Sequence, residues 1–187
     1  MSREIELKYR FPEDRIPQLL SDPWLSAEFC GIAMESTYFD NAEHTLQEKR
    51  ITFRRRREND STVYAVKTPI SAHERGEWEV AAESTEEALS ALSALGAPPL
   101  PQGPYEIVAE AKFFRRAARI RPSDGEEYEV SVDVGTLGPI PFCELEIELK
   151  HGSKDALIAF ATSLADRYQL TPEPLSKFAR ARKYQSL

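Results

Sequence analysis

The segment EIELKY at residues 4–9 strictly alternates charged or polar and apolar side chains. Because successive side chains of a β-strand point to opposite faces, this period of two predicts a strand with one charged face and one apolar face. The same pattern returns in GEWEV at 76–80, in EYEVSVD at 127–133 and in CELEIEL at 143–149. The alternation therefore predicts a sheet built from several two-faced strands.

Four more segments are rich in strand-forming residues: 34–39, 51–57, 62–67 and 105 to about 121. Turn-forming residues separate them, so the connections are short and the sheet is expected to be mostly antiparallel.

Helix signals are fewer than strand signals. Ser84 and Ser153 each stand before a run with apolar residues at spacings of three and four, so each is expected to cap the start of a helix. The second of these helices is expected to run to about Tyr168. Short helices are also plausible at 12–20 and 175–184.

The composition is that of a globular protein with an acidic balance. The 187 residues include 24 Lys and Arg against 31 Asp and Glu, a formal net charge of −7. One domain over residues 1–187 is expected from this length. The negative charge argues against a nucleic-acid polymer as the partner, because such binding rests on positive charge facing phosphates.

Nothing in the sequence suggests a membrane protein or an exported one. No apolar run approaches the roughly 20 residues of a transmembrane helix, and the first residues lack the apolar core of a signal peptide. The two cysteines, Cys30 and Cys143, do not make a disulfide framework and are expected to be free thiols. We therefore expect a cytoplasmic protein without a membrane partner, as a monomer or a homodimer.

Charges are sorted by strand, which simple exposure to water does not explain. Carboxylates dominate the segments near 4–6, 77–79, 129–133 and 144–148, and bases dominate 54–56. If the sheet closed with these faces inward, a polyphosphate held by a divalent metal would balance the buried charges. Carboxylate oxygens suit Mg²⁺ or Mn²⁺, and Arg and Lys suit phosphate oxygens. The simpler alternative is a β-rich protein whose charged faces meet water.

These motifs resemble one known family. EIELK at 4–8 has the E-x-E-x-K pattern that is the hallmark of CYTH proteins, also called triphosphate tunnel metalloenzymes. Supporting motifs follow in family order along nearly the whole chain, namely YFD at 38–40, FRRR at 53–56, Lys67, RGE at 75–77, the segment 129–133, CELEIE at 143–148, Ser176-Lys177 and Arg180.

The resemblance implies an α+β protein with a closed, antiparallel, eight-stranded β-barrel and helices packed outside it. It also implies a small-molecule triphosphate substrate and Mg²⁺ or Mn²⁺ in the barrel. On the long strand, Arg116 is chosen over Arg115 as the base that faces the tunnel. Carried over by position, the expected metal ligands are Glu4, Glu6, Asp133, Glu144, Glu146 and Glu148; the phosphate-binding residues are Lys8, Arg54, Arg56, Lys67, Arg116, Lys177 and Arg180; and the catalytic residues are Glu4, Glu6, Lys8 and Glu146.

The CELEIEL run most resembles the bacterial inorganic triphosphatase branch, which implies hydrolysis of tripolyphosphate to pyrophosphate and phosphate. Thiamine triphosphatase and class IV adenylyl cyclase are alternatives on the same fold. A thiamine substrate would need an aromatic clamp, for which Trp24 and Tyr105 are candidates. A module that binds polyphosphate or a nucleotide without turnover is the alternative outside enzymes. Residues 54–57 could instead form a nucleic-acid patch, Asp133 could cap a turn, and the bases after Lys177 could be a solvated helix end.

Overall fold

The alternating segments all lie in one sheet of a computed structural model that describes residues 2–71 and 73–185. Every strand pairing is antiparallel. The strands are β1 (Ser2–Arg10), β2 (Cys30–Asp40), β3 (Thr52–Glu58), β4 (Ser61–Ser71), β5 (Glu74–Ala81), β6 (Glu106–Ile120), β7 (Glu127–Leu137), β8 (Ile140–His151) and the two-residue β9 (Thr171–Pro172).

The sheet closes on itself through β1. In the order β5-β4-β3-β2-β6-β7-β8-β1, the last strand also pairs with the first. Residues Ser2–Ile5 of β1 pair with β5, and residues Glu6–Arg10 pair with β8. The expected closed, eight-stranded antiparallel barrel is confirmed, and β9 adds a short extra strand at the edge of β1.

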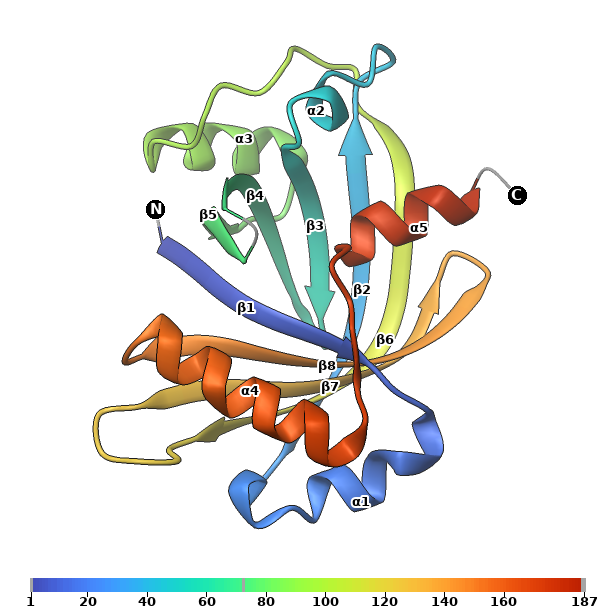
Figure 1. The fold of residues 1–187 in the computed structure, drawn as a ribbon. Helices are drawn as coiled ribbons and strands as arrows, with labels where there is room; N and C mark the ends of the chain where they lie inside the picture. The colour runs from blue at the N-terminus through green and yellow to red at the C-terminus, as the bar shows by residue number, and fades with distance from the viewer. Residues whose placement is uncertain (1, 72, 186–187) are drawn as a thin grey trace.

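Five helices accompany the strands in the described part of the chain (Figure 1). The side chain of Ser84 accepts a hydrogen bond from the backbone N–H of Glu87, and that of Ser153 from Ala156, so both expected N-caps are present. Single 3₁₀ turns at Glu13–Arg15 and Pro23–Leu25 flank the first helix. The helices are α1 (Ile16–Leu20), α2 (Thr45–Glu48), α3 (Thr85–Ala94), α4 (Lys154–Tyr168) and α5 (Lys177–Gln185).

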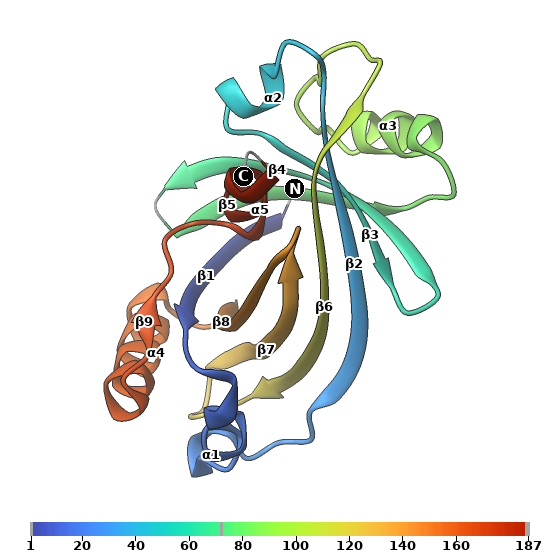
Figure 2. The same ribbon diagram turned by 90° about the vertical axis from the view of Figure 1, so that its right-hand side faces the viewer.

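The apolar strand faces point outward and are covered by helices. α1 and α4 pack over β1, β7 and β8, where Leu145, Ile147 and Leu164 are fully buried. α3 packs over β3, β4 and β5 around Phe53. Figure 2 shows these two helix layers at opposite ends of the view, with the barrel between them. This packing leaves the charged faces of the strands turned toward the barrel interior.

α5 differs from the other helices because it lies against the inward faces of β2 and β6. The ring of Phe178 stacks on Tyr38 at 5.1 Å between centroids, and Ala181 is fully buried in the same apolar cluster. The side chains of Met34 and Phe113 belong to that cluster. The helix therefore narrows one end of the barrel interior and brings its first residue, Lys177, toward the charged strand faces.

Two short elements do not follow from the periodicity. α2 is one turn long, and it is fixed by the buried carboxylate of Asp40, which accepts hydrogen bonds from the backbone N–H groups of Leu46 and Gln47. β9 contains two residues. Both are too short for a period to be recognised. Across the described residues, no helix combines the length and the apolar character needed to cross a bilayer.

Candidate functional site

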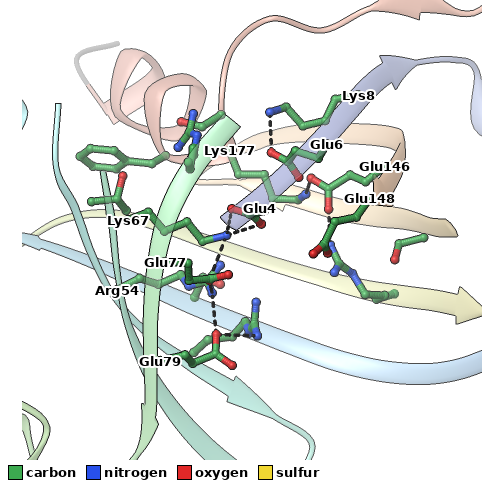
Figure 3. Close-up of a pocket in the computed structure, with 18 of the residues that line it drawn as sticks. Glu4, Glu6, Lys8, Arg54, Lys67, Glu77, Glu79, Glu146, Glu148 and Lys177 are labelled. Carbon is green, nitrogen blue, oxygen red and sulfur yellow. Dashed lines mark hydrogen bonds and ion pairs between the residues drawn. The ribbon is translucent and has the colours of Figure 1, made fainter. Parts of the chain in front are cut away.

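The barrel encloses a charged cavity of about 270 Å³, drawn in Figure 3. Its lining comes from the inward faces of the strands and from the start of α5. Carboxylates and bases are nearly equal in number, so ion pairs partly offset the cost of burying them. The carboxylates are Glu4, Glu6, Glu77, Glu79, Glu129, Glu146 and Glu148, and the bases are Lys8, Arg54, Arg56, Lys67, Arg75, Arg115, Lys150 and Lys177.

On one wall, Lys67 of β4 joins β1 to β5. Its ammonium donates to both carboxylate oxygens of Glu4, at 2.6 and 2.7 Å, and lies 3.1 Å from Glu77. Burial alone would raise the pKa of Glu77, but the charges of Lys67 and Arg54 outweigh it and hold this pKa below its usual value. Glu77 therefore remains charged in the cavity wall at neutral pH.

Two arginines of β3 reach the cavity without satisfying all of their donors. Arg54 lies 3.7 Å from Glu79 and 4.0 Å from Glu77, which is beyond hydrogen-bond distance, and Arg56 lies 3.5 Å from Glu79. Among the described residues, Nε and Nη2 of Arg54 and Nε of Arg56 are buried and have no hydrogen-bond partner. A buried unmatched donor costs about 1–3 kcal/mol, so these groups indicate an acceptor that belongs in the cavity.

Three carboxylates form a row across β1, β8 and β7. In the strand register, Glu6 stands directly opposite Glu148, and Glu148 stands opposite Glu129. Burial raises the pKa of Glu148 to about 7, and the charges of Glu4 and Glu129 add to this, although Lys150 lies 2.6 Å away. Like charges directly opposite each other are destabilising, and hard oxygen donors suit a divalent cation. The row is therefore a fitting place for Mg²⁺ or Mn²⁺.

At the narrowed end of the barrel, Lys177 lies among three carboxylates. Its Nζ is 2.7 Å from Asp133 and 2.8 Å from Glu146, and it also contacts Glu144. Oxygens of these three acids lie within 4.8 Å of one another and form an acidic cluster that could hold a metal. Arg115 adds a two-point contact to Asp133 at 2.8 and 2.7 Å. Burial would raise the pKa of Glu146, but Lys177 and Arg115 outweigh it and hold this pKa well below its usual value.

Most of the expected site residues meet in this cavity. Three others, Asp133, Glu144 and Arg180, are buried behind its end, where Arg180 pairs with Glu144. The expected residues that line the cavity are Glu4, Glu6, Lys8, Arg54, Arg56, Lys67, Glu146, Glu148 and Lys177.

The expectation for Arg116 is wrong. Arg115 lines the cavity, and Arg116 is exposed on the outer face of β6. The physical reason is the doublet sequence Phe113-Phe114-Arg115-Arg116, in which either strand phase places one Phe and one Arg on each face. The pleat that puts Phe113 into the cluster under α5 also turns Arg115 inward.

Several lining residues were not among the expected site residues. Lys150 continues the alternation of Glu144, Glu146 and Glu148 on β8, so the strand period contained the signal for it. Glu77, Glu79 and Glu129 belong to the sorted acidic strands but were given no role. Arg75 lies on β5 two residues before Glu77, on the same strand face, so the period contained the signal for it as well.

Comparisons with known proteins agree with this architecture. A structure from Bacillus halodurans, named as a candidate adenylate cyclase, has a TM-score of 0.64 at 18% identity, over 94% of this chain and 96% of that chain. A candidate adenylyl cyclase from Hippeastrum, whose described dominant activity is triphosphatase, has a TM-score of 0.67 at 19% identity, over 98% and 96%. A Pyrococcus horikoshii protein gives 0.62 at 18%, over 98% and 99%. At these identities the likeness shows a shared fold.

A comparison with curated protein sequences gave no match. The family model for the CYTH domain matches residues 2–181, which is nearly the whole chain and includes every element of the barrel and the first part of α5. This chain therefore belongs to the CYTH domain family.

Proposed function

We propose that this protein is a metal-dependent triphosphatase that hydrolyses inorganic tripolyphosphate to pyrophosphate and phosphate. The observation that carries the proposal is the set of unmatched buried donors on Arg54 and Arg56. Phosphate oxygens are strong acceptors for guanidinium groups, and a triphosphate presents many of them in a line. A chain of phosphates in the cavity would satisfy donors that the protein itself leaves unsatisfied.

Carboxylates on β1 and β8, which pair with each other, would hold the metal. Glu4, Glu6, Glu146 and Glu148 supply oxygen donors on one side of the cavity, opposite the arginines of β3. When bound, Mg²⁺ or Mn²⁺ neutralises phosphate charge and lowers the pKa of a bound water. The near balance of acids and bases in the lining supports this division, because the metal would offset the acids and the phosphates would offset the bases.

The bases then have a defined part in the reaction. Hydrolysis breaks the bond between the terminal phosphorus and its bridging oxygen, and water supplies the new oxygen on phosphorus. Negative charge is spread over the equatorial oxygens and the leaving group in the transition state. Arg54, Arg56 and Lys67 would stabilise that charge, and Lys8, held 2.9 Å from Glu6, lies on the opposite wall. No covalent nucleophile is required.

The positions of the two candidate aromatic clamps argue against thiamine triphosphate. Trp24 stacks on Phe160 outside the barrel, and Tyr105 packs against Phe53 under α3, so neither candidate clamp is near the cavity. Adenylyl cyclase activity is the second candidate, because three structures with this fold carry that name.

The test is orthophosphate release from tripolyphosphate, ATP and thiamine triphosphate, each with Mg²⁺, with Mn²⁺ and with EDTA. We expect fast release mainly from tripolyphosphate, with loss of activity in EDTA. Pyrophosphate together with a cyclic nucleotide from ATP would instead support the cyclase. No product from any of the three, combined with tight binding, would support a binding module.

A further inference from the structure

A second cavity, of about 730 Å³, lies beside the charged cavity of the barrel, which we call the tunnel. It is formed by α5, by the turn after α2 and by the ends of β4 and β5, and Figure 2 shows α5 next to these strand ends. Thr52, Arg75, Ser176 and Phe178 line both cavities. The two cavities are therefore neighbours, with these four side chains at their common boundary.

This second cavity is basic. Its lining includes Arg50, Arg75, Arg182 and Lys183 and no carboxylate, although the protein as a whole carries a net charge of −7. Within residues 2–71 and 73–185, no carboxylate lies within 4.0 Å of the bases of Arg50, Arg75 or Lys183. We call this cavity the basic groove. Its uncompensated charge attracts an anion, whereas the tunnel already contains acids among its bases.

Among the described residues, Arg182 is the one base of the groove with an acidic neighbour. Its Nη1 lies 3.8 Å from Asp40, whose oxygens already accept backbone hydrogen bonds from Asn41, Leu46 and Gln47. The same Nη1 is buried and has no hydrogen-bond partner among the described residues. Arg182 therefore also keeps an unsatisfied donor.

The backbone at Arg50 gives a second, independent observation. Arg50 has φ of 56° in the turn that ends α2, where the N–H of Ile51 bonds to the carbonyl of Leu46 and the N–H of Arg50 bonds to that of Gln47. This is the helix-terminating turn in which glycine is usual, because a side chain in the left-handed region costs about 1 kcal/mol. An arginine at this position gives up stability and keeps a positive charge at the edge of the groove.

We infer that the basic groove binds the continuation of a linear polyphosphate whose terminal three phosphates occupy the tunnel. This inference rests on the proposed triphosphatase function and extends its substrate from tripolyphosphate to longer chains. Hydrolysis at the terminal phosphorus would release one orthophosphate and leave a chain shorter by one phosphate. A nucleoside fits the groove less well, since Phe178, the aromatic residue of its lining, is already stacked on Tyr38.

The experiment compares the binding of tripolyphosphate, a long-chain linear polyphosphate and ATP by isothermal titration calorimetry in EDTA. The test protein is the double variant Arg50→Gly with Lys183→Gln. Arg50→Gly relieves the left-handed backbone, so it is not expected to destabilise the fold. The matched control is Gln169→Gly, in a turn of the same type at the end of α4. Gln169 has φ of 52°, and the N–H of Leu170 bonds to the carbonyl of Ala165. This substitution removes no charge and lies outside the groove.

We expect wild-type protein to bind the long chain more tightly than tripolyphosphate. The double variant should lose about fivefold or more in affinity for the long chain and keep its affinity for tripolyphosphate, and the control should keep both. Equal wild-type affinity for the two chains, an equal loss for both in the double variant, or tighter binding of ATP than of the long chain would each overturn the inference. EDTA prevents turnover, so these results stand apart from the phosphate-release test of the proposed function.

Discussion

The ammonium of Lys177 lies 2.7 Å from the carboxylate of Asp133, which has no exposed side-chain surface. Lys177 is the first residue of α5, and Asp133 lies on β7, so this pair joins the helix to the barrel wall. With Glu144 and Glu146 beside it, the ammonium holds three acids together. It therefore occupies the space that a metal bound to these acids would need.

Replacing Lys177 should make the fold depend on metal. Lys177→Met leaves buried carboxylates without their cation, which typically costs about 3–5 kcal/mol. In EDTA we expect a large fall in melting temperature, and Mn²⁺ should raise the melting temperature of the variant more than that of wild type. Lys183→Met, an exposed site on the same helix, is the control. An equal Mn²⁺ shift in variant and wild type would contradict competition between the ammonium and the metal.

Glu4→Gln and Glu146→Gln should each abolish metal-dependent phosphate release and keep the barrel. Both substitutions remove a charged oxygen donor from the cavity while conserving side-chain volume. In Glu4→Gln, Lys67 still has Glu77 at 3.1 Å as a partner. Circular dichroism would confirm the fold, and phosphate release from tripolyphosphate would report activity. Normal activity in both variants would remove these residues from the site.

The adjacent arginines of β6 form a matched pair for testing the tunnel lining. Arg115→Gln should lower kcat/KM for tripolyphosphate by about tenfold or more, because a charged donor is lost from the cavity. Arg116→Gln should change it less than about twofold, because that side chain is exposed on the outer face. Melting temperatures of both proteins, taken with the kinetics, separate loss of activity from loss of fold. Equal effects on activity would contradict the observed strand phase.

The strands and their faces could be predicted from sequence because the period is strict. Within EIELK and CELEIEL no two charged residues are adjacent and apolar residues separate them, so only one assignment of faces exists. The doublets at 113–116 contain no such information, so the sequence does not decide between Arg115 and Arg116 as the inward base.

The direction in which the charged faces point was a conditional expectation. A period of two is the same for a barrel with a polar interior and for a sheet with a polar exterior. Helices α3 and α4, packed on the apolar faces, decide between these arrangements. The basic groove was also beyond prediction, because Arg50, Arg75 and Lys183 come from a turn, a strand end and a helix whose positions depend on the closed barrel.

The carboxyl of Glu148 should make stability depend on pH. Its pKa of about 7 in the fold exceeds the ordinary 4.5, so between these values the unfolded chain releases a proton that the folded protein keeps. The folded state therefore loses stability as pH rises through this window, and the penalty remains above it. In EDTA, Glu148→Gln should stabilise the protein by roughly 1–3 kcal/mol at pH 8 and have little effect at pH 4.

Urea denaturation at the two pH values measures this difference. Glu28→Gln, at an exposed position, is the control for loss of one negative charge. Excess Mn²⁺ should stabilise wild type at pH 8 and reduce the advantage of the Glu148 variant. A gain of equal size at pH 4 and pH 8 would show that the titration of Glu148 is not its source.

The closure of the barrel by β1, through its pairing with β5 and β8, also bears on how the chain folds. β1 is the first strand of the chain, yet it pairs with β5, β8 and β9, so each of its partners is distant in sequence. Loop-closure entropy must be overcome before such contacts stabilise the chain, and topologies of this kind fold in milliseconds to seconds. Glu4, Glu6 and Lys8 lie on this strand. The charged cavity is thus completed only when β1 pairs and closes the barrel, and partly folded molecules that lack these pairings have no assembled cavity.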